Sequence, residues 1–220
     1  MIHRKYFPHS EDLFSELHSE LIKEFEKGAR GVFLSGGSTP GPLYDRLHMG
    51  PQVRADFFGL GLSDERCVEF ESPQRNQSYF LPLVESEKFR NCSFVLPGKT
   101  SDPVSMRDSL QSNYNDFAAM GGRFSMGVFG IGADGHTCGI FPNQETDSSV
   151  DMDIVKRPDG LMGVTITQKV ISGLDRVILL AVGAGKRDIL QKLFDAPRLV
   201  FALNLLRSVG LVEVWTDNPE

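Results

Sequence analysis

The sequence predicts an α/β protein built on a parallel sheet whose two faces are both covered by helices. Predicted strands alternate with predicted helices along the chain, and each strand is apolar throughout rather than at every second residue. Continuous apolar runs are typical of strands buried on both faces, and the alternation with helices is typical of parallel sheets. Because 220 residues suit one large domain, we expect residues 1–220 to form a single domain.

The first half of the chain supplies two helices and two buried strands. Apolar residues recur at helical spacing over residues 10–27, and Gly28 ends that helix. Residues 31–35 form a short buried strand, and a second helix runs through residues 43–47 to a stop at Gly50. Residues 57–63 form the next apolar strand, which runs into a charged cluster.

The same alternation continues in the second half. Asp102-Pro103 opens a helix that Gly121-Gly122 closes. Strands are expected over residues 124–131, 164–166 and 176–182, and a helix over about 185–194. Ligands of parallel α/β sheets bind beyond the carboxyl ends of the strands. Since the polar and glycine-rich clusters all follow predicted strands, we expect them to converge on one edge of the sheet.

Composition excludes several classes of function. Lys plus Arg is 23 and Asp plus Glu is 29, so the net charge is −6, which predicts no binding to nucleic acid or to an anionic membrane. No apolar run approaches the roughly 20 residues that span a bilayer, and the N-terminus lacks the apolar core of a signal peptide. Three widely spaced cysteines favour free thiols in a reducing compartment, so we expect a cytoplasmic protein. No pattern indicates an oligomeric state.

The loop after the first buried strand suits a phosphate. Gly36, Gly37, Ser38 and Thr39 lie between a strand and a helix, where glycines allow close backbone approach and the helix N-terminus offers free N–H groups. The loop lacks the lysine of a Walker A motif. The alternative is a tight turn in which the threonine caps the helix.

Asp64, Glu65 and Arg66 follow the second strand. Two carboxylates beside a guanidinium suit a base and an anion clamp. The alternative is a solvated strand end with a local ion pair, because charge clusters of this kind are common at surfaces.

The loop after the 124–131 strand carries a histidine within a glycine-rich turn. Gly130, Gly132 and Gly135 satisfy G-x-G-x-x-G, which raises a nicotinamide dinucleotide site as a hypothesis. The regular helix that such a site requires does not follow, which counts against it. Asp134 precedes His136 by two residues, so the carboxylate is able to orient an imidazole that acts as a base. The alternative is a loop histidine with a local hydrogen bond.

A lysine follows the 176–182 strand in the same manner. Lys186 stands after Gly183 and Gly185 at a helix start, where it is placed to meet a phosphate as a point charge; the alternative is a solvated lysine. His136 and Cys138 are the one close His/Cys pair, and no second cluster completes a zinc site. We therefore expect neither a metal nor a cofactor.

In this order, the clusters resemble the 6-phosphogluconolactonase family, within the wider group that includes glucosamine-6-phosphate deaminase. The resemblance covers nearly the whole chain and rests on residues 35–40, 64–66 with Asn76, 130–137 with Phe141-Pro142, 164–167 and 182–186. It implies a three-layer α/β/α sandwich with a mostly parallel, Rossmann-like sheet. It also implies hydrolysis of 6-phosphoglucono-δ-lactone to 6-phosphogluconate. The absence of an acid between Thr137 and Phe141 favours the lactonase branch over the deaminase branch.

The sequence departs from the family pattern at three places. Cys138-Gly139 replaces a usual Ala-Ser, Arg75 replaces a frequent Ser before Asn76, and Gly163 stands where a basic residue is usual. The third departure predicts weaker binding of the phosphate unless Lys156, Arg157 or Lys169 supplies the missing charge.

The residues and the resemblance together predict a mechanism without a covalent nucleophile. His136 takes the proton of the attacking water, Asp134 orients the ring, and Asp64 contacts sugar hydroxyls or the imidazole. The loop of residues 36–39, Arg66 and Lys186 hold the phosphate. Alternatives are a glucosamine-6-phosphate deaminase or isomerase, and a sugar-phosphate-binding protein without catalysis.

Overall fold

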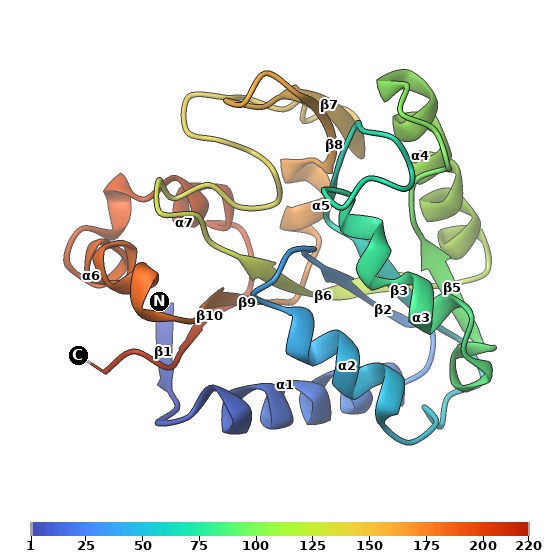
Figure 1. The fold of residues 1–220 in the computed structure, drawn as a ribbon, viewed down its shortest axis with the longest axis horizontal. Coiled ribbons are helices and arrows are strands. Elements are labelled where there is room, and N and C mark those ends of the chain that lie inside the picture. Colours follow the sequence, from blue (N-terminus) through green and yellow to red (C-terminus); the bar gives the residue numbers. More distant parts are fainter. Residues whose placement is uncertain (1, 220) are drawn as a thin grey trace.

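The computed structural model describes residues 2–219 and shows a central sheet between two layers of helices (Figure 1). Its seven strands are ordered β1-β10-β9-β6-β2-β3-β5, and every neighbouring pair is parallel. The strands are β1 (Ile2–Tyr6), β2 (Arg30–Leu34), β3 (Phe58–Leu62), β5 (Cys92–Val95), β6 (Arg123–Gly130), β9 (Arg176–Ala181) and β10 (Leu211–Thr216). The expected three-layer α/β/α sandwich with a mostly parallel sheet is confirmed.

Each face of the sheet has its own apolar core. Side chains alternate across a strand, so Val32 and Leu34 of β2 pack on one face and Phe33 packs on the other. The first face is covered by α1 (Ser10–Phe25), α2 (Gly41–Met49) and α3 (Leu81–Val84). The second is covered by α4 (Pro103–Ala119), α5 (Gln168–Ser172), α6 (Arg187–Asp195) and α7 (Phe201–Leu205). After their first residues, the central strands are therefore largely apolar on both faces.

A second, antiparallel sheet continues from the carboxyl end of β3. It consists of β4 (Asp64–Arg66), β8 (Met162–Ile166) and β7 (Met152–Lys156), in that order. The strand expected over residues 164–166 is confirmed as part of β8, but it lies in this small sheet and not in the parallel one. The small sheet carries three charged residues of β4 directly above the edge at which β3 ends.

The differences between expected and observed elements concern short helices and mostly edge strands. The central strands and the long helices were expected, whereas β1, β4, β5, β7, β10 and the short helices α3, α5 and α7 were not. β1 is an edge strand with three polar residues and no fully buried one, so it lacks the apolar run of a central strand. The helix expected from residue 185 begins with a 3₁₀ turn, η3 (Ala184–Lys186), before α6.

Within residues 2–219, no helix combines the length and the apolarity that crossing a bilayer requires. The cytoplasmic location and the single-domain organisation stay predictions.

Candidate active site

A cleft of about 460 Å³ lies where β2, β3, β6 and β9 end. Eight of the nine residues predicted for the site line it: Gly36, Gly37, Ser38, Thr39, Asp64, Arg66, His136 and Lys186. The ninth, Asp134, does not line the cleft but contacts His136. The expected convergence of the loops on one sheet edge is therefore observed, because parallel strands bring their carboxyl ends together.

His136 and Asp134 form a pair on the loop after β6. Nδ1 of His136 lies 2.6 Å from Oδ1 of Asp134, and the backbone N–H of His136 donates to the same oxygen at 3.1 Å. Burial raises the pKa of Asp134, but these hydrogen bonds outweigh burial and hold the pKa below its usual value. An ionised carboxylate at Nδ1 fixes the ring and leaves Nε2 for a proton transfer.

The pair depends on the absence of a side chain at Gly132. A Cβ atom there would lie 2.1 Å from Nδ1 of His136 and 2.5 Å from Oδ1 of Asp134. Both the ring and the carboxylate therefore occupy the space that any other residue would fill. The Phe141 ring packs against the imidazole at 4.4 Å between centroids, which further limits the motion of the ring.

Asp64 faces the cleft from the start of β4. Ser63 donates from Oγ to Oδ1 of Asp64 at 2.7 Å, and Asn76 donates from Nδ2 to the Asp64 carbonyl at 2.9 Å. Burial raises the pKa of Asp64, and the Ser63 hydrogen bond and the charge of Arg157 oppose that effect. The carboxylate is thus held by neighbours and keeps oxygen lone pairs for a ligand hydroxyl.

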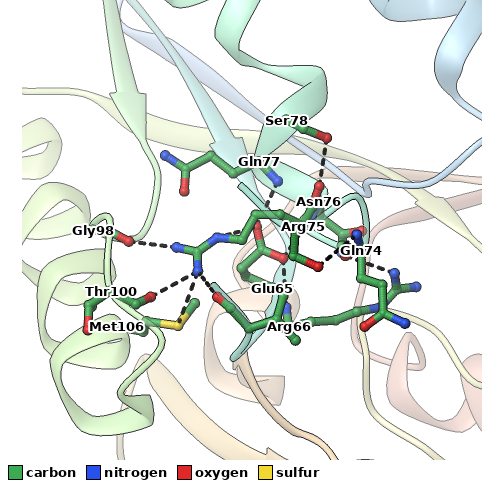
Figure 2. A network of polar contacts seen from close by, with 12 residues as sticks. Glu65, Arg66, Gln74, Arg75, Asn76, Gln77, Ser78, Gly98, Thr100 and Met106 are labelled. Carbon is green, nitrogen blue, oxygen red and sulfur yellow. Dashed lines mark hydrogen bonds and ion pairs between the residues drawn. The ribbon is translucent and has the colours of Figure 1, made fainter. Parts of the chain in front are cut away.

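Glu65, next to Asp64, points away from the cleft into a buried network (Figure 2). Its carboxylate accepts hydrogen bonds from the backbone N–H groups of Arg66, Asn76 and Gln77, at 2.7, 2.8 and 2.7 Å. These bonds tie β4 to the 3₁₀ helix η1 (Asn76–Tyr79). For Glu65 the alternative of a solvated strand end is wrong, because its side chain is fully buried.

Arg75 completes this network (Figure 2). Its guanidinium donates to the carbonyls of Val68 and Thr100 through Nη1, and to the carbonyl of Gly98 through Nη2, at 2.6, 2.9 and 2.6 Å. Its Nε lies 3.5 Å from Oε2 of Glu65. Burial raises the pKa of Glu65 to about 7, and it outweighs the backbone hydrogen bonds and the charge of Arg75, which lower that pKa.

The predicted phosphate loop is open to the cleft. Gly37 has a φ of 100°, a conformation that glycine adopts without strain. The helix α2 begins at Gly41 after Pro40, and no side chain caps it. The alternative in which Thr39 caps this helix is therefore wrong, and its side chain is not used by the helix.

The two predicted cations line the cleft from different elements. Arg66 comes from β4 and donates from Nη1 to the carbonyl of Gln74 at 2.9 Å. Lys186 comes from η3 and donates from Nζ to the carbonyl of Ile131 at 2.6 Å. Each side chain still has unused N–H donors. Two positive groups in one cleft suit an anionic ligand despite the negative net charge, and their role in phosphate binding stays a prediction.

Arg75 and Asn76 line the cleft from the segment after β4, although no role in binding was assigned to them from the sequence. Arg157, one of the three candidates for the charge missing at Gly163, lines the cleft from the turn after β7. Neither short motifs nor strand ends reveal such residues, because their position depends on hairpin register and on long-range loop contacts. The one available signal was that Asn76 belongs, with residues 64–66, to the motifs on which the family resemblance rests.

The nucleotide hypothesis lacks its structural context. No helix forms between Ile131 and Asp151, whereas the dinucleotide fingerprint opens one. Within residues 2–219, no three His, Cys, Asp or Glu side chains are grouped so as to hold a metal ion. Binding without metal or cofactor stays a prediction.

Sequence comparisons place relatives of this chain in one group of enzymes. A sequence profile described as glucosamine-6-phosphate isomerases/6-phosphogluconolactonase matches residues 9–202. The chain is 28% identical to the 6-phosphogluconolactonase of Aggregatibacter actinomycetemcomitans over 76% of this chain and 74% of that protein. It is 30% identical to the human 6-phosphogluconolactonase over 76% of this chain and 70% of that protein.

Comparison of structures gives the same fold. A 6-phosphogluconolactonase from Shewanella baltica OS155 matches with a TM-score of 0.79 at 22% identity, over 98% of this chain and 97% of that chain. The structure of a devB protein matches with a TM-score of 0.79 at 24% identity, over 98% and 96%.

Proposed function

Because the chain belongs to the family of glucosamine-6-phosphate isomerases and 6-phosphogluconolactonases, we propose that it hydrolyses 6-phosphoglucono-δ-lactone to 6-phosphogluconate, in the oxidative pentose phosphate pathway. The similar enzymes from Aggregatibacter and human are both 6-phosphogluconolactonases. The observation that carries the proposal is the His136–Asp134 pair at the wall of a cleft that also contains Arg66 and Lys186. A general base and an anion site in one cleft suit a phosphorylated ester.

The turn after His136 supports the lactonase branch. Thr137 and Ile140 bridge across Cys138 and Gly139, whose φ angles are 52° and 66°. This two-residue turn presents no acidic side chain to the cleft. A deaminase of the wider group supplies a further glutamate in this segment, so the turn favours hydrolysis over amine release.

The reaction requires one base and one water molecule. His136 Nε2 takes a proton from the water, and the water oxygen attacks the lactone carbonyl carbon. The resulting oxyanion is stabilised by hydrogen-bond donors, for which the backbone N–H groups of the glycine-rich loops are the candidates. Collapse of the intermediate breaks the bond to the ring oxygen, which receives the proton from the imidazolium. Asp134 keeps the ring oriented throughout.

Binding of the phosphate at a distance from the reacting carbon positions the ring for attack. We assign this binding to the loop of residues 36–39, Arg66 and Lys186. Asp64 accepts a hydrogen bond from a sugar hydroxyl, since its carboxylate faces the cleft and is already oriented by Ser63. The scheme uses neither a metal ion nor a nicotinamide cofactor.

The test is a lactonase assay with freshly prepared substrate, in which acid release is corrected for spontaneous hydrolysis. We expect hydrolysis above background that survives dialysis against a strong chelator. Loss of activity on chelation, with recovery by one specific metal, would contradict the metal-free scheme. Release of ammonia from glucosamine 6-phosphate would favour the deaminase, and binding of 6-phosphogluconate without lactone turnover would favour a non-catalytic binding protein.

A further inference from the structure

Arg157 is a cation of the cleft that no motif contains. It follows β7 directly, in the turn that leads to β8, and its side chain is 14% exposed. It lines the cleft together with Arg66 and Lys186. Two other basic residues of this region do not line it: Lys156 is exposed, and Nζ of Lys169 lies 2.9 Å from Oδ1 of Asp151.

The guanidinium of Arg157 is fixed before any ligand arrives. Nε and Nη2 donate to Oδ2 of Asp159 at 3.2 and 3.1 Å, and the guanidinium carbon lies 5.3 Å from the centroid of the Phe141 ring. Two of its five N–H donors are thus used, and three remain for a ligand. A charged group held in place loses little conformational freedom on binding, which favours affinity.

Gly163 leaves the space that this side chain occupies. Gly163 is the register partner of Arg66 in β4 and of Val155 in β7, so it stands between the strand that contains Arg66 and the strand that Arg157 follows. A Cβ atom at Gly163 would lie 3.6 Å from Cδ of Arg157 and 3.1 Å from the Glu65 carbonyl oxygen. The residue lies within a strand and its φ is not positive, so its backbone conformation does not require glycine. The 3.6 Å distance is an ordinary van der Waals contact, so a longer side chain at position 163 would begin packed directly against Arg157.

Arg66 and Arg157 act on a common region of the cleft. The charges of both residues lower the pKa of Asp159 together with the Arg157 hydrogen bonds, against the effect of burial. Burial raises the pKa of Asp64, and the charges of both guanidiniums oppose that effect. Since Arg66 and Arg157 also line the same cleft, both are placed to act on one bound anion.

We propose that Arg157 is a third phosphate-binding cation of this cleft, beside Arg66 and Lys186, and that Gly163 gives it room. The assignment rests on the proposed function for the identity of the phosphorylated ligand. It means that the charge expected at Gly163 is supplied from across the β7–β8 hairpin. It also means that residues 157 and 163 act as one unit: a basic side chain works at either position but not at both.

The first experiment measures binding of 6-phosphogluconate and of unphosphorylated gluconate by calorimetry. Arg157→Ala is expected to weaken 6-phosphogluconate binding about tenfold or more, as for the loss of a charge-assisted hydrogen bond. Gluconate binding is expected to change less than twofold. The matched control, Lys156→Ala, removes a neighbouring exposed charge and should leave both affinities unchanged.

The second experiment tests the exchange between the two positions. Gly163→Arg alone is not expected to tighten 6-phosphogluconate binding, because Arg157 already fills the site. In the Arg157→Ala background, the same substitution is expected to restore most of the lost affinity. Thermal melting checks that each variant folds, and Arg157→Gln replaces Arg157→Ala if the alanine variant does not.

Three results would overturn the proposal: unchanged 6-phosphogluconate affinity in a folded Arg157 variant, equal losses for both ligands, or tighter binding by Gly163→Arg in the presence of Arg157. Lactone turnover by the unaltered protein is measured in parallel. Turnover with affinity insensitive to Arg157 contradicts this inference alone. Affinity that depends on Arg157 without any turnover contradicts the proposed hydrolysis and leaves the anion site in place.

Discussion

His136 and Asp64 face the same cleft, but the protein holds them in different ways. His136 is oriented by Asp134, two residues earlier, and the two side chains are 35% and 49% exposed. Asp64 is oriented through Asn76, whose backbone is bonded to Glu65, and the Glu65 and Arg75 side chains are completely buried. On one side of the cleft, His136 is held by contacts within its own loop near the surface. On the other side, Asp64 is attached to a buried network of hydrogen bonds.

This difference has consequences for mutation. A partly exposed side chain held by contacts within its own loop is replaceable without unfolding the chain, so its loss should affect chemistry far more than stability. A buried network stabilises both the loop and the fold, so its loss affects both. We therefore expect substitution of His136 to lower activity without lowering stability. Substitutions in the Glu65 network should lower activity and stability together.

The largest effect is expected from Arg75→Ala. The substitution leaves three carbonyls without their donor and opens a cavity beside Glu65, so the free energy of unfolding should fall by about 3–5 kcal/mol. Urea denaturation measures this loss. Arg90→Ala, which removes an exposed arginine, is the control and should change stability by less than about 0.5 kcal/mol. A loss for Arg75→Ala as small as that of the control would show that the network does not stabilise the fold.

A related effect is expected from pH. In the folded protein, Glu65 has a pKa of about 7, whereas its ordinary value is 4.5. The folded carboxyl thus keeps its proton where the unfolded one has lost it. The free energy of unfolding should therefore fall as pH rises from about 4.5 to about 7, by up to about 3 kcal/mol.

Glu65→Gln should remove the pH-dependent part of the unfolding free energy that Glu65 contributes, whatever the substitution does to absolute stability. The measurement is the difference in unfolding free energy between the variant and the unaltered protein across that pH range. Glu69→Gln, at an exposed glutamate, is the control and should leave the difference flat. A flat difference for Glu65→Gln as well would mean that Glu65 is already ionised at pH 4.5.

On the other side of the cleft, His136→Ala should lower lactone turnover by about a hundredfold or more, with an unchanged melting temperature. The reason is that the variant loses the base, while Phe141, the buried side chain packed against the imidazole, keeps its other packing contacts, such as the one with Arg157. Turnover is measured against spontaneous hydrolysis, and melting is followed by circular dichroism. A variant with a near-normal rate would remove His136 from the mechanism, and one that melts early would show that the two sides of the cleft are not held differently.

The two sides also differ in what the sequence predicts about them. The Asp134–His136 pair is local, so its spacing and the preceding strand were enough to locate it. Strands such as β6 were equally evident, because burial on both faces makes them apolar throughout. The role of Arg75 was not evident, since its partners Gly98 and Thr100 come from a distant loop.

Register and exposure explain the remaining omissions. Arg157 was one of three candidates for the charge missing at Gly163, and the sequence did not single it out, because its place in the cleft depends on the pairing of β7 with β8, which no short motif encodes. The strand β10 includes Glu213, whose carboxylate bonds to Arg176, so its sequence does not look like that of a buried strand. Sequence reasoning therefore located the elements that are buried alike on both faces and the loops that follow them, but not the contacts between distant segments.

The smallest effects are expected from the two cations predicted from the sequence. Arg66 belongs to the side of the cleft that the buried network supports, because its backbone N–H donates to Glu65. Lys186 belongs to the His136 side, because its Nζ is bonded to Ile131 in the same loop. Both charged groups nevertheless lie in the cleft, and the backbone bond of Arg66 survives truncation of its side chain.

Arg66→Ala and Lys186→Ala should therefore each weaken 6-phosphogluconate binding by about 1–3 kcal/mol, leave gluconate binding nearly unchanged, and leave stability unchanged. Calorimetric titration with both ligands, together with urea denaturation, measures all three quantities. If Arg66→Ala lowered stability as Arg75→Ala does, the Arg66 side chain would belong to the buried Glu65–Arg75 network. That network would then include part of the cleft wall. If either variant lost equal affinity for both ligands, that cation would bind the sugar rather than the phosphate.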